Sequence, residues 1–204
     1  MKLLLVHGWG FDASIWDAVR AALKPIETIA WDLGYFGAER LPRVTGPFVA
    51  VGHSLGSLLL AIGPPHGCAG MIAINGFDRF TGDELVPARV LDRMRARFAV
   101  APEAVLNDFR LRCGGSRHQG TIDASCLARD LERLATGDAR GRMVPKLLLQ
   151  GADDPILPAA MRGHVFAGAP RSILAGAGHL LPVTHPDWCA KRIEECVREH
   201  CGSL

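Results

Sequence analysis

Residues 47–62 of this chain read PFVAVGHSLGSLLLAI, and this stretch decides the fold. Its first five residues form a short apolar run with β-branched valines, which is typical of a buried strand. From Ser54 onward the apolar residues continue as a predicted helix. The pentapeptide Gly52-His53-Ser54-Leu55-Gly56 lies between them and predicts a sharp strand-to-helix turn, the nucleophile elbow. Such a turn lifts the Ser54 hydroxyl clear of the sheet edge, where a substrate carbonyl can reach it.

Predicted strands and helices alternate along the rest of the chain. We expect strands at 2–6, 26–31, 47–51, 70–74, 146–150 and 171–174. We expect helices at 13–23, 54–62, 159–166 and 187–200. This alternation predicts an α/β fold, a mostly parallel, doubly wound sheet of about six strands with helices on its faces.

Two regions interrupt the alternation. Residues 32–46 carry no convincing helix, although a crossover helix is expected between two parallel strands. Residues 76–142 contain three helical patterns and no clear strand. Ligands of such sheets bind at the carboxyl ends of the strands. We therefore expect 1–75 and 143–204 to form the core, and 76–142 to form a helical lid over that edge.

Composition restricts the classes of function. The 204 residues suit one domain, with or without an insertion, and a net charge of +2 with 6% aromatic residues argues against a nucleic-acid partner. No membrane-length apolar run and no signal peptide are visible, so we expect a cytoplasmic protein with reduced thiols. No pair of cysteines has C-x-x-C spacing, so a zinc or redox motif is not expected. The cysteines are Cys68, Cys113, Cys126, Cys189, Cys196 and Cys201.

A serine nucleophile needs a base and a group that orients the base, and two later loops offer them. Asp154 follows the predicted strand 146–150, and His179 follows the predicted strand 171–174. Both loops open at the same sheet edge as Ser54. We expect His179 to take the proton of Ser54 and Asp154 to hold the imidazole in the correct tautomer. This chemistry needs no metal and no organic cofactor.

Three alternatives to these assignments stay open at the sequence level. Asp153 can be the acid, with Asp154 capping the following turn. His185 can be the base, although it stands where the last helix is expected to begin. Asp78, after the predicted strand 70–74, is a third candidate acid.

The oxyanion of an acyl intermediate needs two backbone donors. The first expected donor is the amide of Leu55, directly after the nucleophile. The second is the amide of Trp9, in the loop that follows the first strand, where the glycines of His7-Gly8-Trp9-Gly10 let the backbone approach a substrate. Plain core packing of the Trp9 indole is compatible with this role.

Together these ordered motifs resemble the α/β-hydrolase superfamily over the expected core. Within it the chain is similar to the biotin-synthesis carboxylesterases, which are pimeloyl-acyl-carrier-protein methyl ester esterases. The features that carry this resemblance are His7-Gly8-Trp9-Gly10, 31–37, 127–134 running into Gly137-Asp138-Ala139-Arg140, and Gly178-His179 followed by His185-Pro186. The resemblance implies an α/β-hydrolase fold and removal of the methyl ester from pimeloyl-acyl-carrier protein.

This chain departs from that group in two ways. His53 precedes the nucleophile where the group usually has Trp, and the chain lacks the usual first strands and the crossover helix at 32–46. Other functions with the same triad are a small-molecule esterase, a thioesterase or a carbon–carbon hydrolase. A binding protein that kept the fold without catalysis is a further alternative.

A stripe of arginines offers an independent indication of the substrate. Arg89, Arg93 and Arg97 recur every four residues, so on a helix they share one face. Between positions 86 and 117 the chain has seven arginines and only three acidic residues. This local excess of positive charge is larger than that of the whole chain. Arginine suits phosphate and carboxylate groups. The stripe therefore indicates either a docking face for an acidic acyl-carrier protein or a solvated helix face.

Overall fold

The computed structural model describes residues 1–200, and Cys201 lies outside them. Within this range the sheet has six strands in the order β2-β1-β3-β4-β5-β6, and all neighbouring strands are parallel. The predicted doubly wound parallel sheet is confirmed. The strands are β1 (Lys2–Val6), β2 (Glu27–Trp31), β3 (Phe48–His53), β4 (Cys68–Ile74), β5 (Leu147–Gly151) and β6 (Arg171–Leu174).

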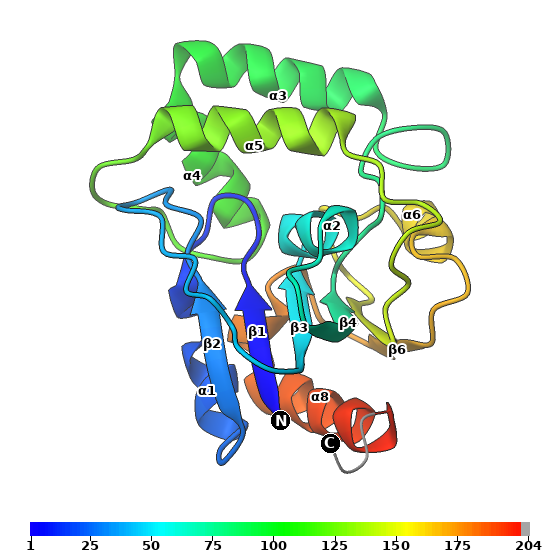
Figure 1. Ribbon diagram of the computed structural model, residues 1–204. Coiled ribbons are helices and arrows are strands. Elements are labelled where there is room, and N and C mark those ends of the chain that lie inside the picture. The colour runs from blue at the N-terminus through cyan, green and yellow to red at the C-terminus, as the bar shows by residue number, and fades with distance from the viewer. Residues whose placement is uncertain (201–204) are drawn as a thin grey trace.

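Helices cover both faces of the sheet (Figure 1). On one face α1 packs against α8, while α2 lies on the opposite face. The helix expected over 13–23 is divided into a 3-10 turn and α1, because the Asp12 side chain accepts from the Ser14 amide and starts a tighter turn. The helical elements are η1 (Ala13–Trp16), α1 (Asp17–Ala22), α2 (Leu55–Ile62), α3 (Ala88–Val100), α4 (Pro102–Arg112), α5 (Ala124–Thr136), α6 (Ala159–His164), α7 (Leu181–Thr184) and α8 (Pro186–His200).

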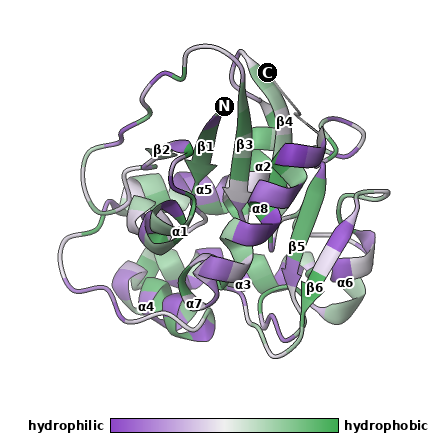
Figure 2. Ribbon diagram, turned by 90° about the horizontal axis from the view of Figure 1, so that it is seen from below, coloured by the Kyte–Doolittle hydropathy of each residue, from purple (hydrophilic) through white to green (hydrophobic). Residues whose placement is uncertain are grey.

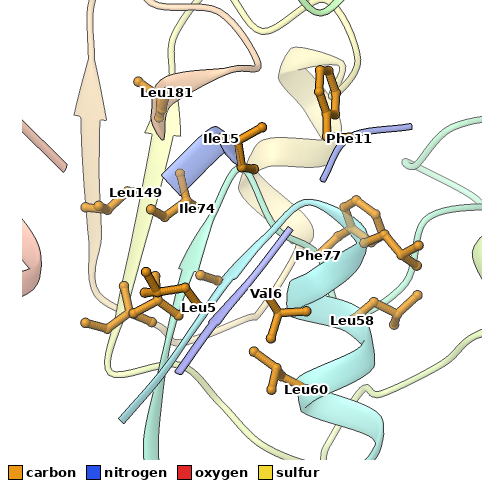
Figure 3. Packing of buried hydrophobic residues seen from close by; sticks show 14 of the residues in the cluster. Leu5, Val6, Phe11, Ile15, Leu58, Leu60, Ile74, Phe77, Leu149 and Leu181 are labelled. Carbon is orange, nitrogen blue, oxygen red and sulfur yellow. The ribbon is translucent and has the colours of Figure 1, made fainter. Parts of the chain in front are cut away.

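The core lies on both sides of the central strands. Successive strand residues point to opposite faces. Figure 3 shows this for Leu5 and Val6: Val6 points toward Leu58 and Leu60 of α2, and Leu5 lies on the other side. Every residue of β3 is buried, as expected for a strand covered on both faces. In Figure 2 the strands β3, β4 and β5 are largely green, whereas much of α8 is purple. The chain thus buries apolar strands beneath amphipathic helices.

The connection 32–46 contains no helix, in agreement with the sequence. It is held by polar contacts instead. The amide and carbonyl of Asp32 pair with those of Arg40, and the indole of Trp31 donates to the Pro42 carbonyl at 3.0 Å. The Asp123 amide, which precedes α5, donates to the Tyr35 carbonyl at 2.7 Å.

Three helices, α3, α4 and α5, lie between β4 and β5 in the chain and sit above the carboxyl ends of the strands (Figure 1). Polar contacts, one buried and one partly buried, attach them to the loops below. The Tyr35 hydroxyl donates to the Asp130 carboxylate at 2.6 Å, and Arg110 donates to the Gly10 carbonyl at 2.7 Å. The division into a core and a lid at residues 76–142 stays a prediction. Among the described helices, none is both long and apolar enough to span a membrane.

Candidate active site

Ser54 lies in the turn between β3 and α2. Its backbone has φ 51° and ψ −121°, a conformation that non-glycine residues rarely adopt and that costs on the order of 1–3 kcal/mol. A hydrogen bond from its amide to the Ile74 carbonyl, at 3.0 Å, holds the strained residue in place. The flanking glycines allow the turn, because a side chain at Gly52 would meet the backbone of Ser57 and one at Gly56 would meet the carbonyl of Val6.

His179 and Asp154 form a buried hydrogen-bonded pair. The two atoms His179 Nδ1 and Asp154 Oδ2 are 2.8 Å apart, and neither side chain is exposed to solvent. The second carboxylate oxygen of Asp154 accepts from the amides of Ile156 and Leu157, at 2.8 and 3.1 Å. Burial raises the pKa of Asp154, but the charge and hydrogen bond of His179 and the two amides outweigh it, so the pKa is lowered.

The second nitrogen of the His179 ring is available as a base. Because an ionised carboxylate only accepts hydrogen bonds, the proton of the neutral ring belongs on Nδ1 and the lone pair on Nε2. Nε2 is buried and has no partner among the described residues. The His179 ring centroid is 5.0 Å from that of His53, the residue before Ser54. The loop 175–179, called the histidine loop from this point on, therefore lies beside the elbow.

Among the described residues, the side chains of Asp153 and Asp78 have no hydrogen bond or ion pair with His179, and the rival base His185 has none with Ser54. Asp153 is exposed, and its amide donates to the Ala177 carbonyl at 2.9 Å. His185 is 2.8 Å from the hydroxyl of its neighbour Thr184, at the junction of α7 and α8. The carbonyl of Asp78 accepts from the Ala139 amide at 2.7 Å.

The loop that carries Trp9, one of the two expected oxyanion donors, lies against the serine. A side chain at Gly8 would stand 2.9 Å from the Cβ atom of Ser54, so only glycine permits this approach. Leu55 begins α2, and the first four amides of a helix have no acceptor within the helix. The Trp9 indole donates to the Leu127 carbonyl at 2.9 Å and packs edge-on against Phe109. The indole thus packs in the core, and the backbone amide of Trp9 is left as the expected oxyanion donor.

Sequence reasoning missed two residues that bind the main chain of His179. His53 Nε2 is 3.0 Å from the His179 carbonyl, and Asn75 Nδ2 is 2.7 Å from the same oxygen. Burial, followed by the charge of His179, lowers the pKa of His53 to about 3, so its ring is neutral. The sequence offered one signal for Asn75, which is a polar residue directly after the buried strand β4. Ligand sites of parallel sheets lie at the carboxyl ends of the strands, so a polar residue there is a candidate site residue.

The arginine stripe runs along α3, and part of it borders α4. Arg89, Arg93 and Arg97 are all exposed, and Arg97 pairs with Asp108 of α4 at 3.1 Å. Within the described residues Arg89 and Arg93 have no ion pair. A groove of about 340 Å³ runs between α3 and α4, with Arg93, Arg97 and Arg112 beside an apolar surface. Its apolar residues are Val90, Met94, Val105 and Phe109.

A family model described as the alpha/beta hydrolase family matches residues 3–192. The chain belongs to the alpha/beta hydrolase family. This membership confirms the fold class and the resemblance inferred from the motifs, and it agrees with the predicted enzyme class, a carboxylic ester hydrolase.

Curated relatives of this alpha/beta hydrolase match nearly the whole chain. A pimeloyl-[acyl-carrier protein] methyl ester esterase from Serratia marcescens is 26% identical over 240 residues, covering 97% of this chain and 94% of the relative. The protein of the same name from Legionella pneumophila (strain Corby) is 27% identical over 228 residues, covering 97% and 95%. A solved thermophilic esterase from Thermogutta terrifontis has a TM-score of 0.77 at 20% identity, covering 98% of this chain and 90% of that one, and supports the fold.

Proposed function

We propose that this chain is a serine carboxylesterase that works through an acyl-enzyme. The observation that carries the proposal is the buried Asp154–His179 pair beside the strained Ser54 elbow. Ser54 Oγ attacks the ester carbonyl while His179 Nε2 takes its proton. The amides of Leu55 and Trp9 stabilise the oxyanion. His179 then protonates the leaving alcohol and activates a water molecule, which hydrolyses the acyl-enzyme and restores Ser54.

A fluorophosphonate probe tests this proposal directly. Such a probe forms a stable phosphonyl ester only with a serine that a base activates. We expect stoichiometric labelling of Ser54, located by peptide mapping, and concurrent loss of ester hydrolysis. Labelling of another residue, or full labelling without loss of activity, would contradict the mechanism.

The finer proposal is that the enzyme acts in the cytoplasm on the methyl ester of pimeloyl-acyl-carrier protein in biotin synthesis. The names of the curated relatives support it. The stripe Arg89, Arg93 and Arg97 supports it independently, because a cationic face with an adjacent groove suits an acidic carrier and its phosphate-bearing arm. We propose these three arginines as contacts for the carrier.

Reversing the stripe, with Arg89, Arg93 and Arg97 all changed to Glu, tests the carrier-bound substrate. We expect kcat/KM to fall about tenfold or more for a carrier-linked methyl ester at low salt, because steering between opposite charges speeds encounter. The difference should shrink at high salt, since exposed charges are screened beyond about 8 Å at physiological ionic strength. Hydrolysis of p-nitrophenyl acetate should stay unchanged, because a small neutral ester has no need of these charges.

The matched control changes Lys24, Lys191 and Arg198 to Glu, which alters the net charge equally at exposed positions outside the helices α3, α4 and α5. It should leave both substrates unaffected. Equal losses on both substrates in the stripe variant would show that the arginines hold α3 in place. No loss on either substrate would show a solvated helix face, and would favour a small-molecule esterase, thioesterase or carbon–carbon hydrolase.

A further inference from the structure

Asn75 connects three segments at the carboxyl edge of the sheet. It directly follows β4, and its amide donates to the Leu149 carbonyl of β5 at 2.8 Å. Its side-chain oxygen accepts from the Gly151 amide at 2.9 Å. Its side-chain nitrogen donates to the carbonyls of Gly178 and His179, at 3.0 and 2.7 Å. One fully buried side chain thus joins the end of β4, the end of β5 and the histidine loop.

The backbone of Asn75 is itself adapted to this position. Its φ is 44°, in the left-handed region that asparagine tolerates better than most residues. This conformation lets the main chain of Asn75 pair with β5 while the side chain faces the histidine loop. The side chain uses both donors of its amide nitrogen and one acceptor of its oxygen, so its orientation is fixed by the network.

His53 supplies a second donor to the same carbonyl. Its Nε2 is 3.0 Å from the His179 oxygen, and the ring is fully buried between Phe11 and His179. A carbonyl has two lone pairs, and the two donors satisfy both. The main chain of His179 is therefore held from the end of β3 and from the residue after β4, while its ring is held by Asp154 from the loop after β5.

We propose that Asn75 is a positioning residue for His179, and that it sets the position of the histidine main chain relative to Ser54. The loop before His179 contains Gly176, at φ 73°, and Gly178, so its own backbone restrains it weakly. Asp154 fixes only the direction of the ring. Asn75 fixes the position of the His179 Cα atom, because it binds the carbonyls of the two peptide groups that flank this atom, those of Gly178 and His179. This inference rests on the proposed catalytic role of His179.

Two substitutions separate the contacts of Asn75. Asn75→Asp keeps the size of the side chain and the acceptor for the Gly151 amide, but it loses both donors to the histidine loop. Asn75→Gly removes every side-chain contact and still accommodates a positive φ. We expect both variants to lower kcat for p-nitrophenyl acetate by about ten- to a hundredfold at unchanged KM, because a misplacement of about 1 Å can cost that much.

The matched control is Gln150→Ala. Gln150 is also fully buried, lies one residue before Gly151 and binds a carbonyl, that of Arg162, at 3.2 Å. Within the described residues, its side chain makes no hydrogen bond to the histidine loop. This variant should lower the thermal midpoint, as the Asn75 variants do, and keep kcat per folded molecule. Folded molecules are counted by circular dichroism and by the Ser54 labelled at completion with the fluorophosphonate.

Each outcome decides for or against the positioning role. A lower kcat per labelled serine in both Asn75 variants, with the control unchanged, supports it. Activity that falls only with the folded fraction, a rise in KM alone, or an Asn75→Asp variant with the wild-type kcat would overturn it. Ser54→Ala separates this result from failure of the proposed function: if Ser54→Ala retains activity, the triad is wrong, whereas if it is inactive and the Asn75 variants are normal, only the positioning role is wrong.

Discussion

Ser54→Ala is expected to nearly abolish ester hydrolysis while leaving the fold intact. Loss of the nucleophile in a serine triad costs about 10⁶-fold in kcat. The Ser54 side chain makes no hydrogen bond within the described residues, so its removal breaks no structural contact. The measurement is kcat for p-nitrophenyl acetate, with the thermal midpoint as the test of folding.

The matched control is Ser57→Ala, in the first turn of the same helix. The Ser57 hydroxyl is buried and donates to the Gly52 carbonyl at 2.7 Å, so its loss should destabilise the fold by about 1 kcal/mol. This variant should keep its activity at temperatures where it is folded. Residual activity of about a tenth of wild type in Ser54→Ala would be far above what remains without the nucleophile, and would exclude the acyl-enzyme mechanism.

Asp154→Asn is expected to lower kcat by about 10⁴-fold, as loss of the orienting acid does in a serine triad. The geometry explains the size of the effect. The oxygen of the new amide must keep accepting from the amides of Ile156 and Leu157. Its NH₂ group then faces Nδ1 of His179, which becomes an acceptor and moves the ring proton to Nε2. A protonated Nε2 cannot take the proton of Ser54.

The neighbouring substitution Asp153→Asn is the control, because it makes the same chemical change at an exposed side chain. We expect its kcat to stay within about a factor of two of wild type, since surface substitutions have small effects. The comparison uses p-nitrophenyl acetate at neutral pH and both thermal midpoints. A larger loss for Asp153→Asn than for Asp154→Asn would reverse the assignment of the acid.

The sequence predicts the elements of this fold well where the pattern is local. The strand, turn and helix around Ser54 follow from apolar runs and two glycines, and the parallel sheet follows from the alternation of strands with helices. The loops of Asp154 and His179 could be placed at one edge because they follow parallel strands. The catalytic roles of these residues stay predictions, although the structure does bring Asp154 rather than Asp153 to His179.

The contacts that hold the histidine loop could not be predicted in the same way. Asn75 and His53 bind His179 from positions 104 and 126 residues away in the chain. No periodic pattern marks such pairs, because they depend on how the strand ends meet in space. The division of the helix at 13–23 also escaped prediction, since a single aspartate side chain decides whether the first turn is tight.

The Trp9 side chain joins the loop of an expected oxyanion donor to the helix α5. Ser54 is only 5% exposed, and the Trp9 indole is tied to the Leu127 carbonyl of α5. If α5 moves outward to admit a substrate, as the predicted lid would, this bond must break or Trp9 must move with the helix. If the Trp9 amide serves the oxyanion, as proposed, displacement of Trp9 also withdraws that donor. An open site is then an inactive one, and the return of α5 over a bound ester restores both the enclosure and the donor in a single event.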